Sequence, residues 1–246
     1  MAATHYVTSP DVSKTPGQVG FYTAIFTALI TLVTFGFAIV AVPVSGEYCV
    51  EGCVQYPYLD TVAQFPKDYR WMPLAMILVL SYLVLIVSIH AGASQDRKIF
   101  SQIGLAFAII AALILLVDYF LQFSVVPISL MSGETEGIAM LTQYNPHGIF
   151  IALEELGYIM MSLSFLFVAP VFAGRTRLET WIFWIFILAF GLTLAALVIA
   201  TITRGLDRQD NFEIAVISID WLALVVNGIL LSIVFRRQIG RAAARP

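Results

Sequence analysis

The amino-acid sequence predicts an all-α membrane protein, folded as a bundle of six transmembrane helices. The chain has a mean hydropathy of +0.90, and it is 60% hydrophobic but only 12% charged, which excludes an ordinary soluble domain. Six apolar runs are each long enough to cross a bilayer, which takes about 20 residues. Alternating strand-sized segments of the kind that build an outer-membrane barrel are not evident.

The six predicted spans are joined by short connections at one end of the bundle and longer ones at the other. The two short connections predict that the second and third spans, and the fourth and fifth, pack as antiparallel neighbours. No internal repeat is evident, so we expect one membrane domain over residues 1–246. The predicted spans are 20–42, 71–91, 103–123, 147–172, 180–203 and 212–235.

The distribution of lysine and arginine predicts the orientation of the bundle. Nine of the 13 basic residues fall on the side of the N-terminus, and four fall in the opposite loops. Positive charge favours the cytoplasmic side, so we expect both termini in the cytoplasm and the protein in a plasma (inner) membrane. The polar first 19 residues lack the pattern of a signal peptide, so the first span should insert as an uncleaved signal.

The long outer loop over residues 43–70 is rich in aromatic residues, as is typical of segments at the level of the lipid headgroups. Within it, residues 58–65 are expected to form a short amphipathic helix. Cys49 and Cys53 also lie in this loop. A disulfide, two free thiols, and metal or redox chemistry all remain open for this pair, and the disulfide is the favoured reading in an oxidising compartment.

Four acidic side chains fall inside the predicted spans, where an acid costs about 2.5–3.5 kcal/mol at mid-bilayer. With a rise of about 1.5 Å per residue, all four lie roughly 8–13 Å below the outer boundary, on three different helices. No lysine or arginine lies within these spans, so some of the carboxyls should be protonated at neutral pH. These acids are Asp118, Glu154, Glu155 and Asp220.

Helical spacing adds polar companions to the acids. Gln122 shares a helix face with Asp118, and both Tyr158 and His147 share a face with Glu154. Asn227 follows Asp220 by seven residues, so it lies on the same helix face, two turns further toward the cytoplasmic side. Glu154 and Glu155 differ by about 100° around the helix, so only one of them can face the bundle axis.

Three functions remain open on the sequence alone. The leading hypothesis is a non-enzymatic protein whose outer-half carboxylate pocket binds, senses or conducts a proton, a small cation or a compact polar ligand. The second is a structural or accessory subunit, in which the acids hydrogen-bond neighbouring helices. The third is an intramembrane lipid-modifying enzyme that uses paired carboxyls as acid and base.

The expected partners follow from the same composition. They are the lipid bilayer, a small cation or polar ligand, and a second copy of the chain or another membrane protein. No cofactor is predicted: every lysine lies outside the spans, and the histidines are too few and too scattered for a haem or zinc site. No residues are assigned as ligands of a resident metal ion, and a nucleic acid is not expected as a partner.

Overall fold

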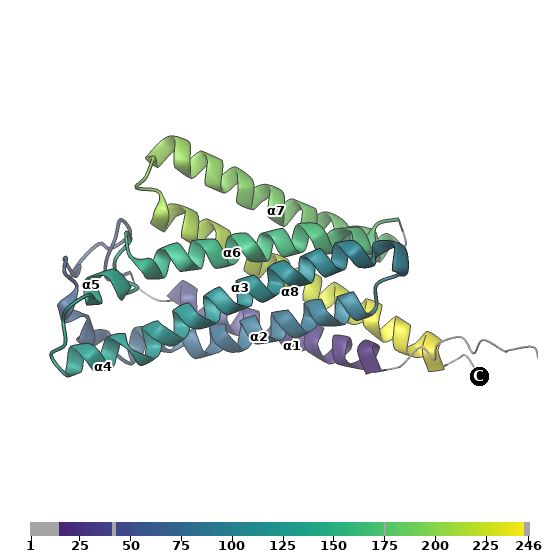
Figure 1. Ribbon diagram of the computed structural model, residues 1–246, viewed down its shortest axis with the longest axis horizontal. Coiled ribbons are helices and arrows are strands. Elements are labelled where there is room, and N and C mark those ends of the chain that lie inside the picture. The colour runs from purple at the N-terminus through teal and green to yellow at the C-terminus, as the bar shows by residue number, and fades with distance from the viewer. Residues whose placement is uncertain (1–14, 41–42, 175, 244–246) are drawn as a thin grey trace, which may run out of the picture.

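The computed structural model describes residues 15–40, 43–174 and 176–243, and in these ranges every regular element is a helix (Figure 1). Six of the helices are long and apolar enough to cross a membrane. The predicted class, a polytopic helical bundle, is therefore confirmed. Lys14, Arg175 and Arg245, which contribute to the predicted basic face, lie outside the described residues.

Three of the helices, over residues 98–124, 177–204 and 209–243, extend at both ends beyond the apolar runs that predicted them. Hydropathy marks only the part of a helix that lies in hydrocarbon, whereas backbone hydrogen bonding continues into the polar flanks. The second membrane helix coincides with the predicted span 71–91, and the fourth begins at Ile149 rather than at residue 147. The membrane helices are α1 Thr15–Val40, α2 Trp71–Ala91, α3 Lys98–Ser124, α6 Ile149–Val168, α7 Arg177–Arg204 and α8 Gln209–Ala243. The short helices are η1 Leu59–Gln64, η2 Lys67–Tyr69, η3 Gln95–Arg97, α4 Val126–Met131, α5 Ile138–Leu141 and η4 Ala169–Phe172.

Five of the membrane helices form a closed ring in the order α1, α2, α3, α6 and α8, and α8 returns to pack along α1. The seam between α1 and α8 joins the first and last helices of the described chain. Helix α7 lies outside this ring and packs against α6 and α8, at the edge of the bundle in Figure 1. The predicted neighbours, α2 with α3 and α6 with α7, do pack together.

Small residues allow the ring helices to approach closely. A Cβ atom placed on Gly157 of α6 would lie 2.6 Å from the side chain of Leu115 on α3. A Cβ atom on Gly228 of α8 would lie 2.9 Å from the backbone oxygen of Ala24 on α1. Glycine at such positions permits van der Waals packing, the main source of helix association in a bilayer.

One end of the bundle carries the segments that surround the candidate site. The loop after α1 and the helices η1 and η2 lead into α2, while α4 and α5 lie between α3 and α6. The segment predicted as an amphipathic helix over residues 58–65 contains the 3-10 helix η1. The loop after α1, the helix η2 and the loop before α6 line a cavity together with the ends of α1, α2, α6 and α8.

Candidate functional site

A cavity of about 250 Å³ opens among the ends of α1, α2, α6 and α8. Its lining includes two acids, Asp68 in η2 and Glu213 near the start of α8. The loop that precedes α6 contributes Gln143, Tyr144 and Pro146 to the wall. This is the loop of residues 129–146, acidic and bracketed by glycines in the sequence.

Glu154 is buried about one helical turn beyond Ile151, which lines this cavity. Its side chain is 1% exposed, and its carboxyl lies within hydrogen-bonding range of the carboxyl of Glu213. Glu213 is only half-buried and lines the cavity itself. The two acids therefore connect the cavity to the interior of the bundle.

A chain of hydrogen bonds extends from Glu154 into the core. The hydroxyl of Tyr119 donates to Oε1 of Glu154 at 2.6 Å, and it lies 2.9 Å from the hydroxyl of Tyr158. The indole Nε1 of Trp221 donates to the Tyr158 hydroxyl at 3.0 Å. Helices α3, α6 and α8 are thereby joined through one buried network that ends on the Glu154 carboxyl.

Asp118 lies beside this network without joining it. Its side chain is 3% exposed, on the buried face of α3, and it is near enough to Glu154 for the two carboxyls to interact electrostatically. Among the described residues, no hydrogen-bond partner reaches its Oδ2 atom.

Glu155 takes a different partner from its neighbour. Both of its carboxyl oxygens accept from Nη1 of Arg208 at 2.8 Å. Arg208 precedes α8 and also lies over the ring of Phe212, with its guanidinium carbon 5.5 Å from the ring centroid. The ion pair is largely buried, with side-chain exposures of 26% for Arg208 and 8% for Glu155.

Asp220 and Asn227 lie deeper than Glu154. Oδ1 of Asp220 accepts from the hydroxyl of Ser162 at 2.7 Å, and Ser162 is two helical turns beyond Glu154 on α6. Ser162 also lies 2.8 Å from the hydroxyl of Thr193 on α7. Within the described part of the chain, Oδ2 of Asp220 and both polar side-chain atoms of Asn227 have no hydrogen-bond partner.

Two further predicted site residues lie apart from the acids. The Gln122 amide donates to the hydroxyl of Tyr69 at 3.3 Å and accepts from the backbone N–H of Gln143 at 3.1 Å, so it braces the cavity wall. His147 lies at the surface, where its Nε2 is 2.9 Å from Asp207 and its side chain is 64% exposed. The structure thus groups Glu154 and Tyr158, with Asp118 close by. Asp220 lies within electrostatic range of Tyr158 but takes Ser162 as its hydrogen-bond partner. The other predicted site residues lie apart from the pair: Glu155, Asn227, Gln122 and His147.

The outer loop is tied to α7 and α8 by Glu47. Its carboxyl accepts from Arg204 at 2.8 Å and from the amide of Asn211 at 3.0 Å. Hydrogen bonds from Asn211 and Arg204 lower the pKa of Glu47 below its usual value. This contact is therefore stable above the ordinary pKa of a glutamate and is lost as the pH falls through the lowered value.

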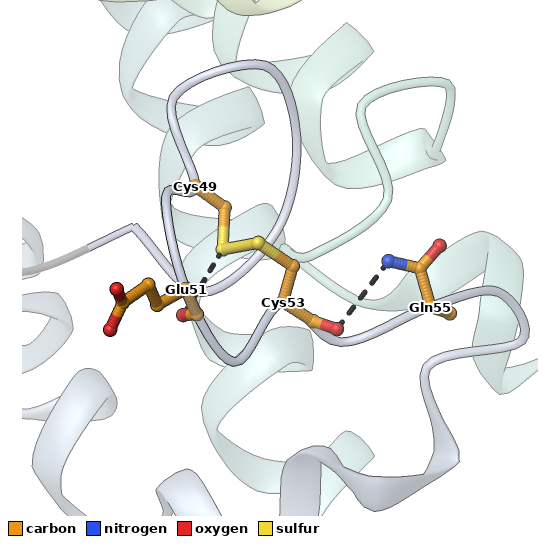
Figure 2. The surroundings of a disulfide bond; sticks show 4 residues. All are labelled: Cys49, Glu51, Cys53 and Gln55. Atoms are coloured by element: carbon orange, nitrogen blue, oxygen red, sulfur yellow. Dashed lines mark hydrogen bonds between the residues drawn. A yellow bond between two sulfur atoms is a disulfide. The ribbon is translucent and has the colours of Figure 1, made fainter.

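Cys49 and Cys53 are joined by a disulfide, as favoured from the sequence, with an S–S distance of 2.09 Å (Figure 2). Beyond the disulfide, the amide of Gln55 donates to the carbonyl of Cys53 at 3.4 Å. The bridge closes the loop immediately after Glu47 and Tyr48. Because Tyr48 donates to Asn211 at 2.6 Å and lines the cavity, this crosslinked loop forms one wall of the cavity.

Several residues of the site were not identified from the sequence. Glu213 stands seven residues before Asp220 and fourteen before Asn227, so helical periodicity alone places all three on one face of α8. Tyr119 and Arg208 carried no comparable signal, because their roles depend on which helices meet.

Comparison with known proteins yields no relative from which a function could be transferred. The chain matches no protein-family model, no curated protein and no solved structure. The function must therefore be argued from the geometry of the buried carboxyls and the cavity.

Proposed function

We propose that this integral membrane protein binds a proton or small cation at the carboxyl pair of Glu154 and Glu213. The observation that carries the proposal is the contact between these two carboxyls at the cavity, one buried and one half-buried. Two ionised carboxylates can only accept hydrogen bonds, so they repel each other at this range unless a proton or cation lies between them.

The hydrogen-bond donors available in the network support a proton bound between Glu154 and Glu213. An indole N–H can only donate, so Tyr158 accepts from Trp221 and its own proton is free to go to Tyr119. Tyr119 in turn gives its single proton to Oε1 of Glu154. The tyrosines therefore supply no further proton for the contact with Glu213, and that contact requires one taken up from outside the network.

The ligand set favours a proton over a metal ion. Among the described residues, no group of three or more His, Cys, Asp or Glu side chains has the arrangement needed to hold a metal. A proton, by contrast, requires only two oxygens at hydrogen-bonding distance. Glu213 lines the cavity and is the group through which the proton enters and leaves.

The distribution of charge supports a location in a plasma membrane with both termini in the cytoplasm. In that orientation the cavity faces outward, and the carboxyl pair takes up its proton from the external side. The function is then the sensing or transport of external protons.

The test is the thermal unfolding midpoint of the purified protein, measured as a function of pH for the wild type and for Glu213→Gln. The wild-type midpoint should fall once the pH is high enough for the shared proton to dissociate, because two negatively charged carboxylates then face each other. The expected loss of stability is on the order of 1–3 kcal/mol. In Glu213→Gln the amide donates to Glu154 at every pH, so this fall should disappear.

Glu134→Gln is the matched control, because it removes the same charge from an exposed loop position and should keep the wild-type pH dependence. Titrations with sodium and with calcium at high pH distinguish a bound proton from a bound small cation. Stabilisation of the wild type but not of Glu213→Gln would identify a small cation. A Glu213→Gln variant with unchanged pH dependence would refute the proposed site.

A further inference from the structure

A second cavity, of about 420 Å³, lies at the opposite end of the bundle, where α7 begins and α8 ends. Its lining combines polar and basic groups with one buried apolar residue, Val234. The other lining residues are Thr176, Glu179, Arg237, Gln238 and Arg241. None of them contributes to the carboxyl site, so the two cavities are independent.

The two arginines are the main charged groups of this cavity. Arg237 and Arg241 stand four residues apart on α8 and so share one helix face. Elsewhere in the chain, the guanidinium of Arg204 is committed to Glu47 and that of Arg208 to Glu155. Within the described residues, neither Arg237 nor Arg241 takes part in an ion pair.

The remaining lining residues are compatible with an anion. Oε2 of Glu179 accepts from the backbone N–H and the hydroxyl of Thr176, in the capping box that starts α7. This carboxyl is thus directed toward the helix cap, and the two arginines outweigh its charge. The positive end of the α7 dipole adds to the same field.

The depth of the cavity indicates where its ligand comes from. Arg237 stands 26 residues after Asn211, where the apolar span of α8 begins. At about 1.5 Å per residue this is roughly 39 Å, more than the hydrocarbon core of about 30 Å and close to the full bilayer of about 40–45 Å. The guanidinium groups therefore lie at the level of the lipid headgroups.

We propose that this cavity binds the phosphate group of an anionic membrane lipid. Guanidinium groups match phosphate with paired, charge-assisted hydrogen bonds. The volume falls in the range of ordinary ligand pockets, about 300–1,000 Å³. Val234 offers an apolar surface to the glycerol end of the lipid, and Gln238 supplies a further amide donor.

The experiment measures lipid binding to the full-length protein in a neutral detergent, by native mass spectrometry and by the unfolding midpoint. The probes are phosphatidylglycerol, phosphatidylcholine and inorganic phosphate. The wild type should retain phosphatidylglycerol in preference to phosphatidylcholine. Arg237→Gln and Arg241→Gln should each weaken the binding of phosphatidylglycerol at least about fivefold, and Arg237→Lys should give an intermediate loss.

Arg236→Gln is the matched control, because Arg236 is an exposed neighbour of the same charge that does not line the cavity. It should bind phosphatidylglycerol as the wild type does. Equal losses in Arg236→Gln and Arg237→Gln, or the absence of a preference for phosphatidylglycerol, would overturn the site. If inorganic phosphate at equal concentration displaced the lipid, the proposal that the bound phosphate group belongs to a lipid would be overturned. Circular dichroism establishes that each variant is folded.

Discussion

At the scale of single residues, the adjacent acids Glu154 and Glu155 show how one step along a helix changes the chemistry of a side chain. A rotation of about 100° per residue turns Glu154 toward Tyr119 and Glu213, and turns Glu155 toward Arg208. Glu155 is paired with a guanidinium at 2.8 Å. Glu154 has hydroxyl and carboxyl partners instead, which is why we propose it as the proton-binding acid.

The ion pair of Glu155 and Arg208 is expected to stabilise the folded protein. Arg208→Gln leaves the buried carboxylate without a cation, and should lower the free energy of unfolding by roughly 1–3 kcal/mol. Arg204→Gln breaks the exposed pair with Glu47 and should cost less than about 1 kcal/mol. Chemical denaturation in micelles measures both, and equal losses in the two variants would contradict this ranking.

At the scale of the helices, close contact between α1 and α8 closes the ring. The approach is permitted by Gly228, since any side chain there would meet backbone atoms of Ala24 rather than the movable end of a side chain. Most of the other face of α1 is exposed on the outside of the bundle. The stability of this seam therefore depends on a few small residues.

Gly228→Ala should lower the free energy of unfolding by about 1–3 kcal/mol, as expected for overpacking of a tight interface. The matched control is Gly36→Ala on α1, where a Cβ atom would meet nothing within 4 Å. That substitution should be neutral or slightly stabilising, because alanine favours helix. A Gly228→Ala variant as stable as Gly36→Ala would show that the seam can relax.

At the scale of the whole molecule, the two ends of the bundle differ in their chemistry. The end that carries the long loops has an acid-lined cavity, whereas the opposite end has a cavity lined by Arg237 and Arg241. The predicted orientation, in which the basic end faces the cytoplasm, remains a prediction that labelling can test.

Single cysteines introduced at Glu134 and at Gly240 test this orientation, since both positions are exposed and lie at opposite ends of the bundle. In intact cells, a membrane-impermeant maleimide should label Glu134→Cys and leave Gly240→Cys unlabelled until the cells are permeabilised. The native cysteines are joined in a disulfide and do not react. The reverse pattern of labelling would place both termini outside.

Much of the architecture follows from the sequence alone. The apolar runs determine six spans, because hydrocarbon admits only segments that satisfy their own backbone hydrogen bonds. The short connections determine which helices are neighbours. The regular rise of a helix gives the approximate depth of Glu154 and Asp118, and the spacing of seven residues that unites Glu213, Asp220 and Asn227 is likewise present in the sequence.

Only the tertiary structure decides which partner each acid meets. The contact of Glu154 with Glu213, and of Glu155 with Arg208, depends on how α6 is rotated against α8 and on the path of the loop before α8. The separation of Asp220 from Glu154 depends on the stagger of the same two helices. Rotation and stagger are set by side-chain packing between segments far apart in the chain, whereas hydropathy and helical periodicity describe each segment by itself.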